Sequence, residues 1–255
     1  MRNCLLIMAC LLTVAGCSSS VKKKQNLSAT STSDANSSED DIFNEFEEEM
    51  TQQKVTIADP LEPFNHLMFN LNDKLYFWVV KPVTQVYSDI IPKPARIGID
   101  NFFVNLQTPT RLANCLLQGK FSAAGNEVNR FGINTTIGVL GLGDPAKDRW
   151  GLESSNEDLG QTLAVHGFGN GFYIVWPLIG PSTLRDSIGM GGDAFLNPIR
   201  YVKPEEVSIG ISAVDITNGG SFHIGDYESI KAASVDPYIA IRNSYIQYRS
   251  KLVKE

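Results

Sequence analysis

DPLEPFNHLMFNLNDKLYFWVV, residues 59–80, is the most informative stretch for the architecture of this 255-residue chain. From Phe64 onward its large apolar side chains recur at the three- and four-residue spacing of an α-helix. Asp59 can cap such a helix, Pro60 suits its first turn, and Glu62 lies three residues after the cap. Further apolar side chains lie off this stripe. A helix that is apolar over most of its circumference is either deeply buried or in contact with lipid.

Two later segments carry similar helix signals. Thr108 and Pro109 precede the run TRLANCLLQ, and Asp236 and Pro237 precede YIAIRNSYIQYRSKLV. Alternating patterns typical of strands are scarce. We therefore expect one mainly α-helical domain over residues 59–255, and about 195 residues is enough for a substantial core.

Glycines are concentrated in the middle of the chain. Thirteen of the 21 fall between Gly132 and Gly192, a density that allows tight turns, hinges and close backbone approach. A loop-rich half of an ordinary globular domain would have the same composition, so glycine content by itself does not identify a function.

The first 17 residues, MRNCLLIMACLLTVAGC, have the layout of a secretory signal. Arg2 gives a positive start, an apolar core follows, and small residues precede Cys17. This layout resembles a bacterial lipoprotein signal, so we expect residues 1–16 to be removed and Cys17 to carry lipid. The alternatives are an ordinary signal peptide with an incidental cysteine, or a buried N-terminal helix.

Residues 17–58 connect the lipidation site to the helical domain. They are rich in Ser, Thr and Asn and then acidic, with few side chains that could form a core, so we expect a disordered acidic tether. Residues 1–55 hold five basic and eight acidic residues, half of the chain's net charge of −6. No basic cluster stands out in the remainder, which argues against a nucleic-acid partner.

The sequence lacks a recognisable catalytic motif. There is no G-x-S-x-G nucleophile elbow, and His66, His166 and His223 are too scattered for a zinc site. Cys115 lies in an apolar helical pattern typical of a small core residue. Carboxylates could pair in space, but sequence spacing does not place any two together. We therefore predict a protein that is not an enzyme and that has no cofactor and no metal site.

Five blocks, in order, resemble the VacJ (MlaA) family of outer-membrane phospholipid-transport lipoproteins. They cover nearly all of the helical domain, whereas residues 203–224 match only loosely. The blocks are DPLEPFNHLMFNLND (59–73), KPARIGIDNFFVNLQTPTRLANCLLQGK (93–120), RFGINTTIGVLGLGDPA (130–146), DLGQTLAVHGFGNGFYIVWPLIGPSTLRDSIG (158–189) and SVDPYIAIRNSYIQYR (234–249).

The resemblance implies a ring of amphipathic helices that lies in the inner leaflet of the outer membrane, on the periplasmic side, around an amphipathic channel with glycine-rich loops. Helices parallel to the membrane can occupy one leaflet, because half of a ~30 Å hydrocarbon core is only ~15 Å thick. Ser18 follows Cys17, as in lipoproteins that are sent on to the outer membrane.

The implied function is removal of mislocalised phospholipids from the outer leaflet, which maintains the lipid asymmetry of the outer membrane. The implied partners are phospholipids, a trimeric porin and a periplasmic lipid carrier, with an ATP-driven inner-membrane complex at the far end of the pathway. Two other classes stay open: a structural, porin-associated lipoprotein without transport, and a periplasmic hydrolase of lipid or cell wall.

Candidate residues for the channel wall and its gate follow from the same resemblance. The polar ones could line a headgroup path, although a helix cap or a buried hydrogen bond is the alternative for each. Phe69-Asn70 places an amide among apolar neighbours, where its hydrogen bonds must be found locally or lost. Deleting this pair should therefore misplace the first helix and alter channel opening. The candidates are Phe69, Asn70, Asn134, Thr135, Thr136, Gly141 and Gln161.

Overall fold

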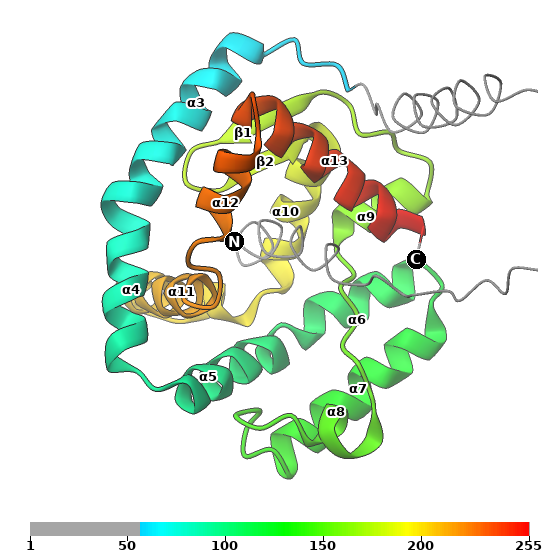
Figure 1. The fold of residues 1–255 in the computed structure, drawn as a ribbon. Coiled ribbons are helices and arrows are strands. Elements are labelled where there is room, and N and C mark those ends of the chain that lie inside the picture. The colour runs from blue at the N-terminus through cyan, green and yellow to red at the C-terminus, as the bar shows by residue number, and fades with distance from the viewer. Residues whose placement is uncertain (1–56, 255) are drawn as a thin grey trace, which may run out of the picture.

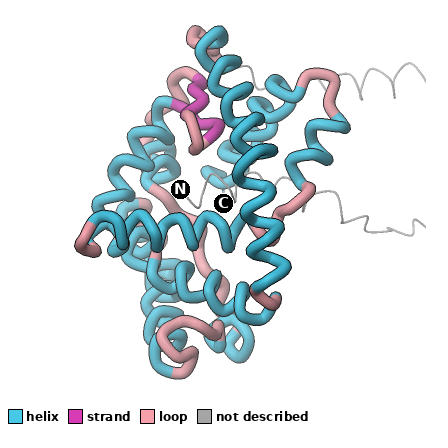
Figure 2. Tube along the Cα trace, turned by 90° about the vertical axis from the view of Figure 1, so that its left-hand side faces the viewer, coloured by secondary structure: helices cyan, strands magenta, loops and turns pink. Residues whose placement is uncertain are grey.

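The computed structural model describes residues 57–254 of the chain. Over this range the helices form a ring, in which α3 and α4 make one side, α5 and α6 make the base, and α9 and α13 lie opposite (Figure 1). The view turned by 90° shows helices at several levels along the ring axis (Figure 2). The predicted signal peptide, Cys17 and nearly all of the predicted tether lie outside the described residues.

The described elements are helical except for one short hairpin. In chain order they are α3 (Glu62–Leu75), the π-helix η2 (Tyr76–Val80), α4 (Lys81–Ile90), α5 (Lys93–Leu106), α6 (Thr108–Leu117), α7 (Phe121–Thr136), α8 (Pro145–Trp150), α9 (Leu159–Val165), β1 (Tyr173–Trp176), β2 (Gly180–Thr183), α10 (Leu184–Leu196), the 3₁₀-helix η3 (Pro198–Tyr201), α11 (Glu205–Gly220), α12 (Asp226–Ala233) and α13 (Pro237–Lys254).

The first helix confirms the apolar pattern but begins later than its cap signals predicted. It starts at Glu62 with Leu61 at the cap position and without a side-chain cap. Asp59, which we expected to be the cap, instead uses its carboxylate in long-range contacts described below. α3 continues through the π-helical turn η2 into α4, and such π-turns occur frequently at functional sites.

The hairpin is an element that the sequence analysis missed. Its strands are antiparallel, with Tyr173 opposite Thr183 and Trp176 opposite Gly180. Because the hairpin has two strands, each strand has one edge whose backbone groups need partners elsewhere. α3 contacts β1 closely enough to provide them.

The distribution of apolar and polar side chains is inverted relative to a typical globular protein. Among the described residues, twelve buried residues are hydrophobic and twenty are polar or charged, so hydrogen bonds and ion pairs hold much of the interior together. Large apolar side chains are meanwhile exposed, including Ile90 at 69%, Trp78 at 77% and Leu178 at 79%. Deep burial of the first helix, one of the two alternatives for its apolar surface, is therefore wrong.

A smaller hydrophobic cluster lies where the hairpin meets the last helix. Its buried members are Tyr173, Val175, Tyr238, Tyr245 and Ile246. No helix within residues 57–254 combines the length and the hydropathy that crossing a membrane requires.

Candidate functional site

Asn65 binds the free edge of β1 with both ends of its side-chain amide. This fully buried residue donates from Nδ2 to the carbonyl oxygen of Tyr173 (3.1 Å) and accepts at Oδ1 from the N–H of Val175 (2.8 Å). The amide thus takes the place of a neighbouring strand, satisfying backbone groups that would otherwise be unpaired at a buried edge.

Asn72 repeats this arrangement at the end of the strand. Its Nδ2 donates to the carbonyl oxygen of Trp176 (2.9 Å), and its Oδ1 accepts from the N–H of Leu178 (2.8 Å). Asn65 and Asn72 are seven residues apart, about two helical turns, so both side chains lie on the face of α3 turned toward the hairpin. We call these two residues the amide clamp.

Further polar contacts extend the line marked by the amide clamp. At one end, Asp59 accepts hydrogen bonds from Asn65, Tyr238 and Arg242. At the other end, Asp73 accepts from Tyr227 and Lys231, each at 2.7 Å.

The π-helical turn takes part through its first residue. Tyr76 donates to Glu228 at 2.7 Å, and Lys81, directly after the turn, forms an ion pair with the same carboxylate at 2.6 Å. We call this contact of α3 and η2 with β1, α12 and α13 the seam. It joins parts of the chain more than 100 residues apart, so the ring is closed here by noncovalent contacts.

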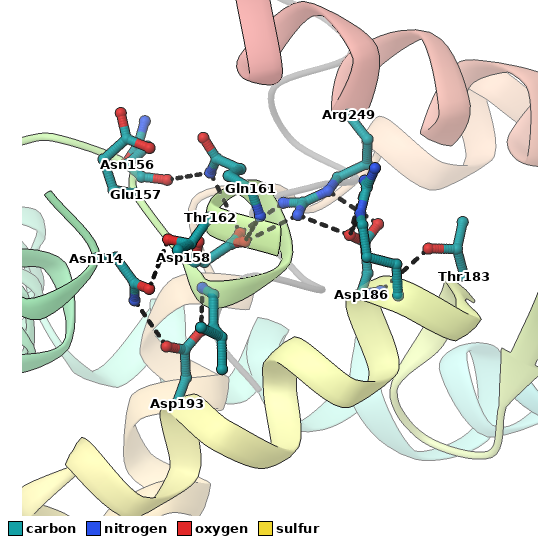
Figure 3. Close-up of polar contacts among 12 residues, drawn as sticks. Asn114, Asn156, Glu157, Asp158, Gln161, Thr162, Thr183, Asp186, Asp193 and Arg249 are labelled. Atoms are coloured by element: carbon teal, nitrogen blue, oxygen red, sulfur yellow. Dashed lines mark hydrogen bonds and ion pairs between the residues drawn. The ribbon is translucent and has the colours of Figure 1, made fainter. Parts of the chain in front are cut away.

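A buried ion-pair network lies where α13 meets α9 and α10 (Figure 3). The Arg249 guanidinium binds Asp158 of the α9 cap with both terminal nitrogens and Asp186 of α10 with Nε and Nη2. Tyr245 donates to Asp186 at 2.7 Å, and Arg185 contacts the same carboxylate. Burial would raise the pKa of Asp186, but Arg249 and Arg185 outweigh it and hold that pKa below its usual value.

Glycine allows the two helices of this network to approach closely. A Cβ at Gly189 of α10 would lie 2.4 Å from the backbone nitrogen of Gly160 on α9, and one at Gly192 would lie 2.2 Å from a methyl carbon of Leu159. Part of the glycine density between residues 132 and 192 therefore serves helix packing rather than loops.

Asp193 links three helices next to this network. Its carboxylate, on α10, accepts from the Asn114 side chain of α6 (2.8 Å) and from the Leu159 N–H of α9 (3.0 Å) (Figure 3). Burial raises the pKa of Asp193 to about 6; these two hydrogen bonds and the charge of Arg249 oppose the rise, whereas the charge of Asp158 adds to it.

We expect Asp193 to make the folded protein more stable as pH falls from about 7.5 to about 5. The folded state holds the proton more tightly than the unfolded chain, whose Asp pKa is about 3.9, so lowering pH relieves the cost of the charged form. The pKa values of Asp144 and Asp186 are lowered, so their opposite effect begins below this window. Urea unfolding at both pH values should show a larger gain for the wild type than for Asp193→Asn; equal gains would contradict this assignment.

Three candidates, on α7 and in the loop after it, form contacts between helices that we call the brace. Asn134 is buried, donates to Asp144 (2.8 Å) and accepts from the N–H of Ala146 (3.0 Å). Burial would raise the pKa of Asp144, but hydrogen bonds from Arg130 and Asn134 more than offset it and lower that pKa. The structure thus gives Asn134 the buried hydrogen bonds that were its alternative to channel lining.

Thr135 and Gly141 meet on Asn105 of α5. Thr135 accepts from the Asn105 amide at 3.0 Å, and a Cβ at Gly141, whose φ is +89°, would lie 2.6 Å from the Asn105 Cβ. Gly141 is therefore required by both its backbone conformation and its close contact. Thr136 is exposed and donates back to the carbonyl oxygen of Gly132, within its own helix, at 2.7 Å.

The loop between these residues contains a feature that the sequence analysis missed. Val139 and Leu140 have φ values of 53° and 57°, in the left-handed region, and are 66% and 65% exposed. Apolar residues other than glycine rarely adopt this conformation, so the surrounding brace holds the loop in a strained form.

The remaining candidates lie apart from this brace. Gln161 is buried in the Arg249 network, where its Nε2 donates to the carbonyl oxygen of Asn156 at 2.5 Å (Figure 3). Phe69 packs against the hydrophobic cluster and meets Tyr238 edge-on at 5.8 Å between ring centroids.

Asn70 requires a correction. Its amide lies among apolar neighbours in the sequence, but the residue is exposed, and the hydrogen bonds described for residues 57–254 do not include its side chain. The amides of α3 that need partners are Asn65 and Asn72, and both find them in the hairpin. The reason for choosing Asn70, an amide in need of hydrogen-bond partners, therefore does not hold.

The family of the chain follows from comparison with known proteins. The family model described as "MlaA lipoprotein" matches residues 57–252, which is nearly the whole described range. The chain belongs to the MlaA lipoprotein family. The family resemblance and the mainly helical ring inferred from the sequence are thus confirmed.

Several MlaA relatives are similar over most of their length. The "Intermembrane phospholipid transport system lipoprotein MlaA" of Shigella flexneri is 34% identical over 197 residues, covering 74% of this chain and 76% of the relative. The protein of the same name in Escherichia coli K12 is 33% identical with the same coverage. An uncharacterized protein of Rickettsia conorii is 32% identical over 201 residues, covering 78% of this chain and 80% of the relative.

A solved structure also matches the MlaA fold described above. It comes from work on the "structural basis for maintenance of bacterial outer membrane lipid asymmetry" and superposes with a TM-score of 0.68 at 33% identity. The match covers 77% of this chain and 99% of the other. An MlaA relationship thus extends over both the sequence and the fold of the described domain.

Proposed function

We propose that this protein removes mislocalised phospholipids from the outer leaflet of the outer membrane and passes them to a periplasmic carrier. The ring lies in the inner leaflet on the periplasmic side, anchored by lipid on Cys17, and phospholipid passes through an amphipathic channel along it. Family membership supports the general role, since relatives are named for intermembrane phospholipid transport.

The inverted distribution of side chains is the observation that carries this proposal. A ring whose interior is held by polar contacts and whose outer side chains are apolar suits an apolar solvent, such as one leaflet of a bilayer. Helices on the lipid-facing side satisfy their own backbone groups, which irregular segments exposed to lipid could not do. Exposed Trp78 and Ile90 on the long α3–η2–α4 helix would then contact acyl chains.

We propose a role that involves no catalysis. A lipid or cell-wall hydrolase needs a nucleophile or a pair of carboxylates directed at a substrate. Two carboxylates that Figure 3 shows, those of Asp158 and Asp186, are both bound by Arg249. This arrangement supports an architectural role for the two acids.

A trimeric porin and a periplasmic lipid carrier are the partners that we propose. A porin would give the ring a fixed place in the membrane, and the carrier would remove phospholipid that has passed through. Because the chain itself supplies no energy source in this scheme, the direction of transport would come from the partners.

The gene deletion tests the proposal in cells. Phospholipid amines labelled from outside the cell should increase several-fold when the gene is deleted and return to the wild-type level on complementation. A surface label that does not change on deletion would contradict transport. A purely structural role as a lipoprotein would then be the remaining interpretation.

Replacing the predicted lipidation site tests whether lipid on Cys17 is needed to bring the protein to the outer membrane. We expect Cys17→Ala to reduce the amount of protein in the outer-membrane fraction about tenfold or more, because stable anchoring requires acyl chains. Membrane fractionation and the surface label should change together. If Cys17→Ala protein still reached the outer membrane and restored the wild-type label, lipid on Cys17 would be unnecessary.

A further inference from the structure

We propose that Asn65 and Asn72 are positioning residues for lipid passage, because the amide clamp holds the ring closed at the seam. The inference rests on the proposed transport function and adds to it a place where the ring opens. It concerns two side chains that bind backbone rather than lipid, so their effect would act through the position of α3.

The geometry makes the amide clamp a two-point attachment. Asn65 binds the carbonyl and N–H of residues 173 and 175, and Asn72 binds those of residues 176 and 178. One attachment would leave α3 free to pivot on the strand. Two attachments on one helical face fix both the distance and the angle between helix and hairpin.

The two attachments differ in exposure, so their roles can be separated. Asn65 is fully buried, and its loss would leave backbone groups unpaired away from water. Asn72 lies at a more exposed position, beside the turn that carries Leu178, which has a φ of +66° and is 79% exposed. Water can replace Asn72 as a hydrogen-bond partner, so Asn72→Ala should fold even if Asn65→Ala does not.

The noncovalent seam is a place where the ring can open without unfolding. Consecutive elements such as α5 and α6 are joined by the chain itself, and long-range hydrogen bonds also hold α4 and α5 against α11. At the seam, α3 meets segments more than 100 residues away through hydrogen bonds and ion pairs. Releasing the amide clamp would therefore loosen α3 on β1 while leaving the distant α6–α7 pair, held by the Arg111–Glu127 ion pair, unchanged.

Amide hydrogen exchange on the full-length protein in detergent micelles measures this directly. For Asn72→Ala we expect the Leu178 N–H to exchange about tenfold faster, and for Asn65→Ala the same at Val175, because each loses its acceptor. Amides of α7 should exchange within about twofold of their wild-type rate in both variants. Asn70→Ala is the matched control, since it removes an exposed amide from the same helix between the two clamp residues.

The same variants are then compared in cells by the surface phospholipid label. We expect the label to rise several-fold for Asn72→Ala at normal protein level in the outer membrane, and to stay at the wild-type level for Asn70→Ala. A merely structural role would accelerate exchange throughout the protein or reduce its amount, rather than act at the seam.

Three outcomes would overturn the inference. The first is an unchanged exchange rate of the Leu178 and Val175 amides, which would show that the amide clamp does not hold the edge of the hairpin. The second is faster exchange at the seam together with a wild-type surface label, which would leave the transport function standing without any role for the clamp. In the third, the complete gene deletion also leaves the label unchanged; then the proposed transport fails, and the inference fails with it.

Discussion

Deletion of Phe69 and Asn70 should raise the surface phospholipid label to at least the level of the complete gene deletion. The deletion shortens the spacing between Asn65 and Asn72 from seven residues to five. At about 100° per residue, the two amides would then point about 140° apart, so both could not bind the same strand edge. The loss of Phe69, which packs against the hydrophobic cluster, adds to the cost.

The reason for this effect differs from the one that the sequence suggested. The sequence alone points to hydrogen bonds of Asn70, whereas the structure points to the spacing of two other amides. Asn70→Ala distinguishes the two explanations, because it should leave the label unchanged. If this substitution raised the label as much as the deletion does, the spacing explanation would be wrong.

Arg249→Ala should produce the largest loss of stability among single substitutions. It would leave Asp158 and Asp186 buried without their shared cation, and breaking a buried ion pair by removing one partner costs about 3–5 kcal/mol. Urea unfolding in detergent, followed by circular dichroism, measures the change in the free energy of unfolding. Lys254→Ala, at the exposed end of the same helix, is the control and should cost less than about 0.5 kcal/mol.

A compensating variant tests the cause of that loss. Arg249→Met combined with Asp158→Asn removes the charge of Asp158 together with the cation, while Asp186 keeps its ion pair with Arg185, so it should recover part of the lost stability. A double variant less stable than Arg249→Ala would contradict this cause, since the loss would then come from side-chain shape and not from unpaired charge.

The helical class of the domain could be predicted from sequence because helix signals are local. The spacing of apolar residues in α3 and the Thr108-Pro109 and Asp236-Pro237 starts all lie within segments that became helices. Buried Cys115 was likewise predicted from its immediate neighbours. The hairpin was missed because Tyr173–Trp176 is a short apolar run, which periodicity cannot distinguish from a buried helical segment.

The polar contacts of the site depend on partners that sequence spacing does not show. Asp59 has the signature of a helix cap, but Tyr238 and Arg242, almost 180 residues later, use its carboxylate. Asn65 and Asn70 look equivalent in the sequence, and their different burial results from a strand more than 100 residues away. The spacing of seven between Asn65 and Asn72 was the available signal for the amide clamp, because equal residue types two turns apart share a helix face.

Two of the polar candidates have hydrogen-bond partners within the protein. Asn134 and Gln161 were chosen as channel lining, and their side chains are engaged in buried hydrogen bonds. Because hydrogen bonds and ion pairs hold much of this interior together, polarity in the sequence does not by itself distinguish a residue that links helices from one that lines a path.

The rate at which phospholipid leaves the outer leaflet tests the central claim most directly. Surface phospholipid is labelled in a short pulse, the label is removed, and its loss from the surface is followed over time with and without the gene. The account predicts a several-fold slower loss without the protein, with the labelled lipid chemically intact in both strains. An equal rate in the two strains, or loss accompanied by lysophospholipid that depends on the gene, would contradict it.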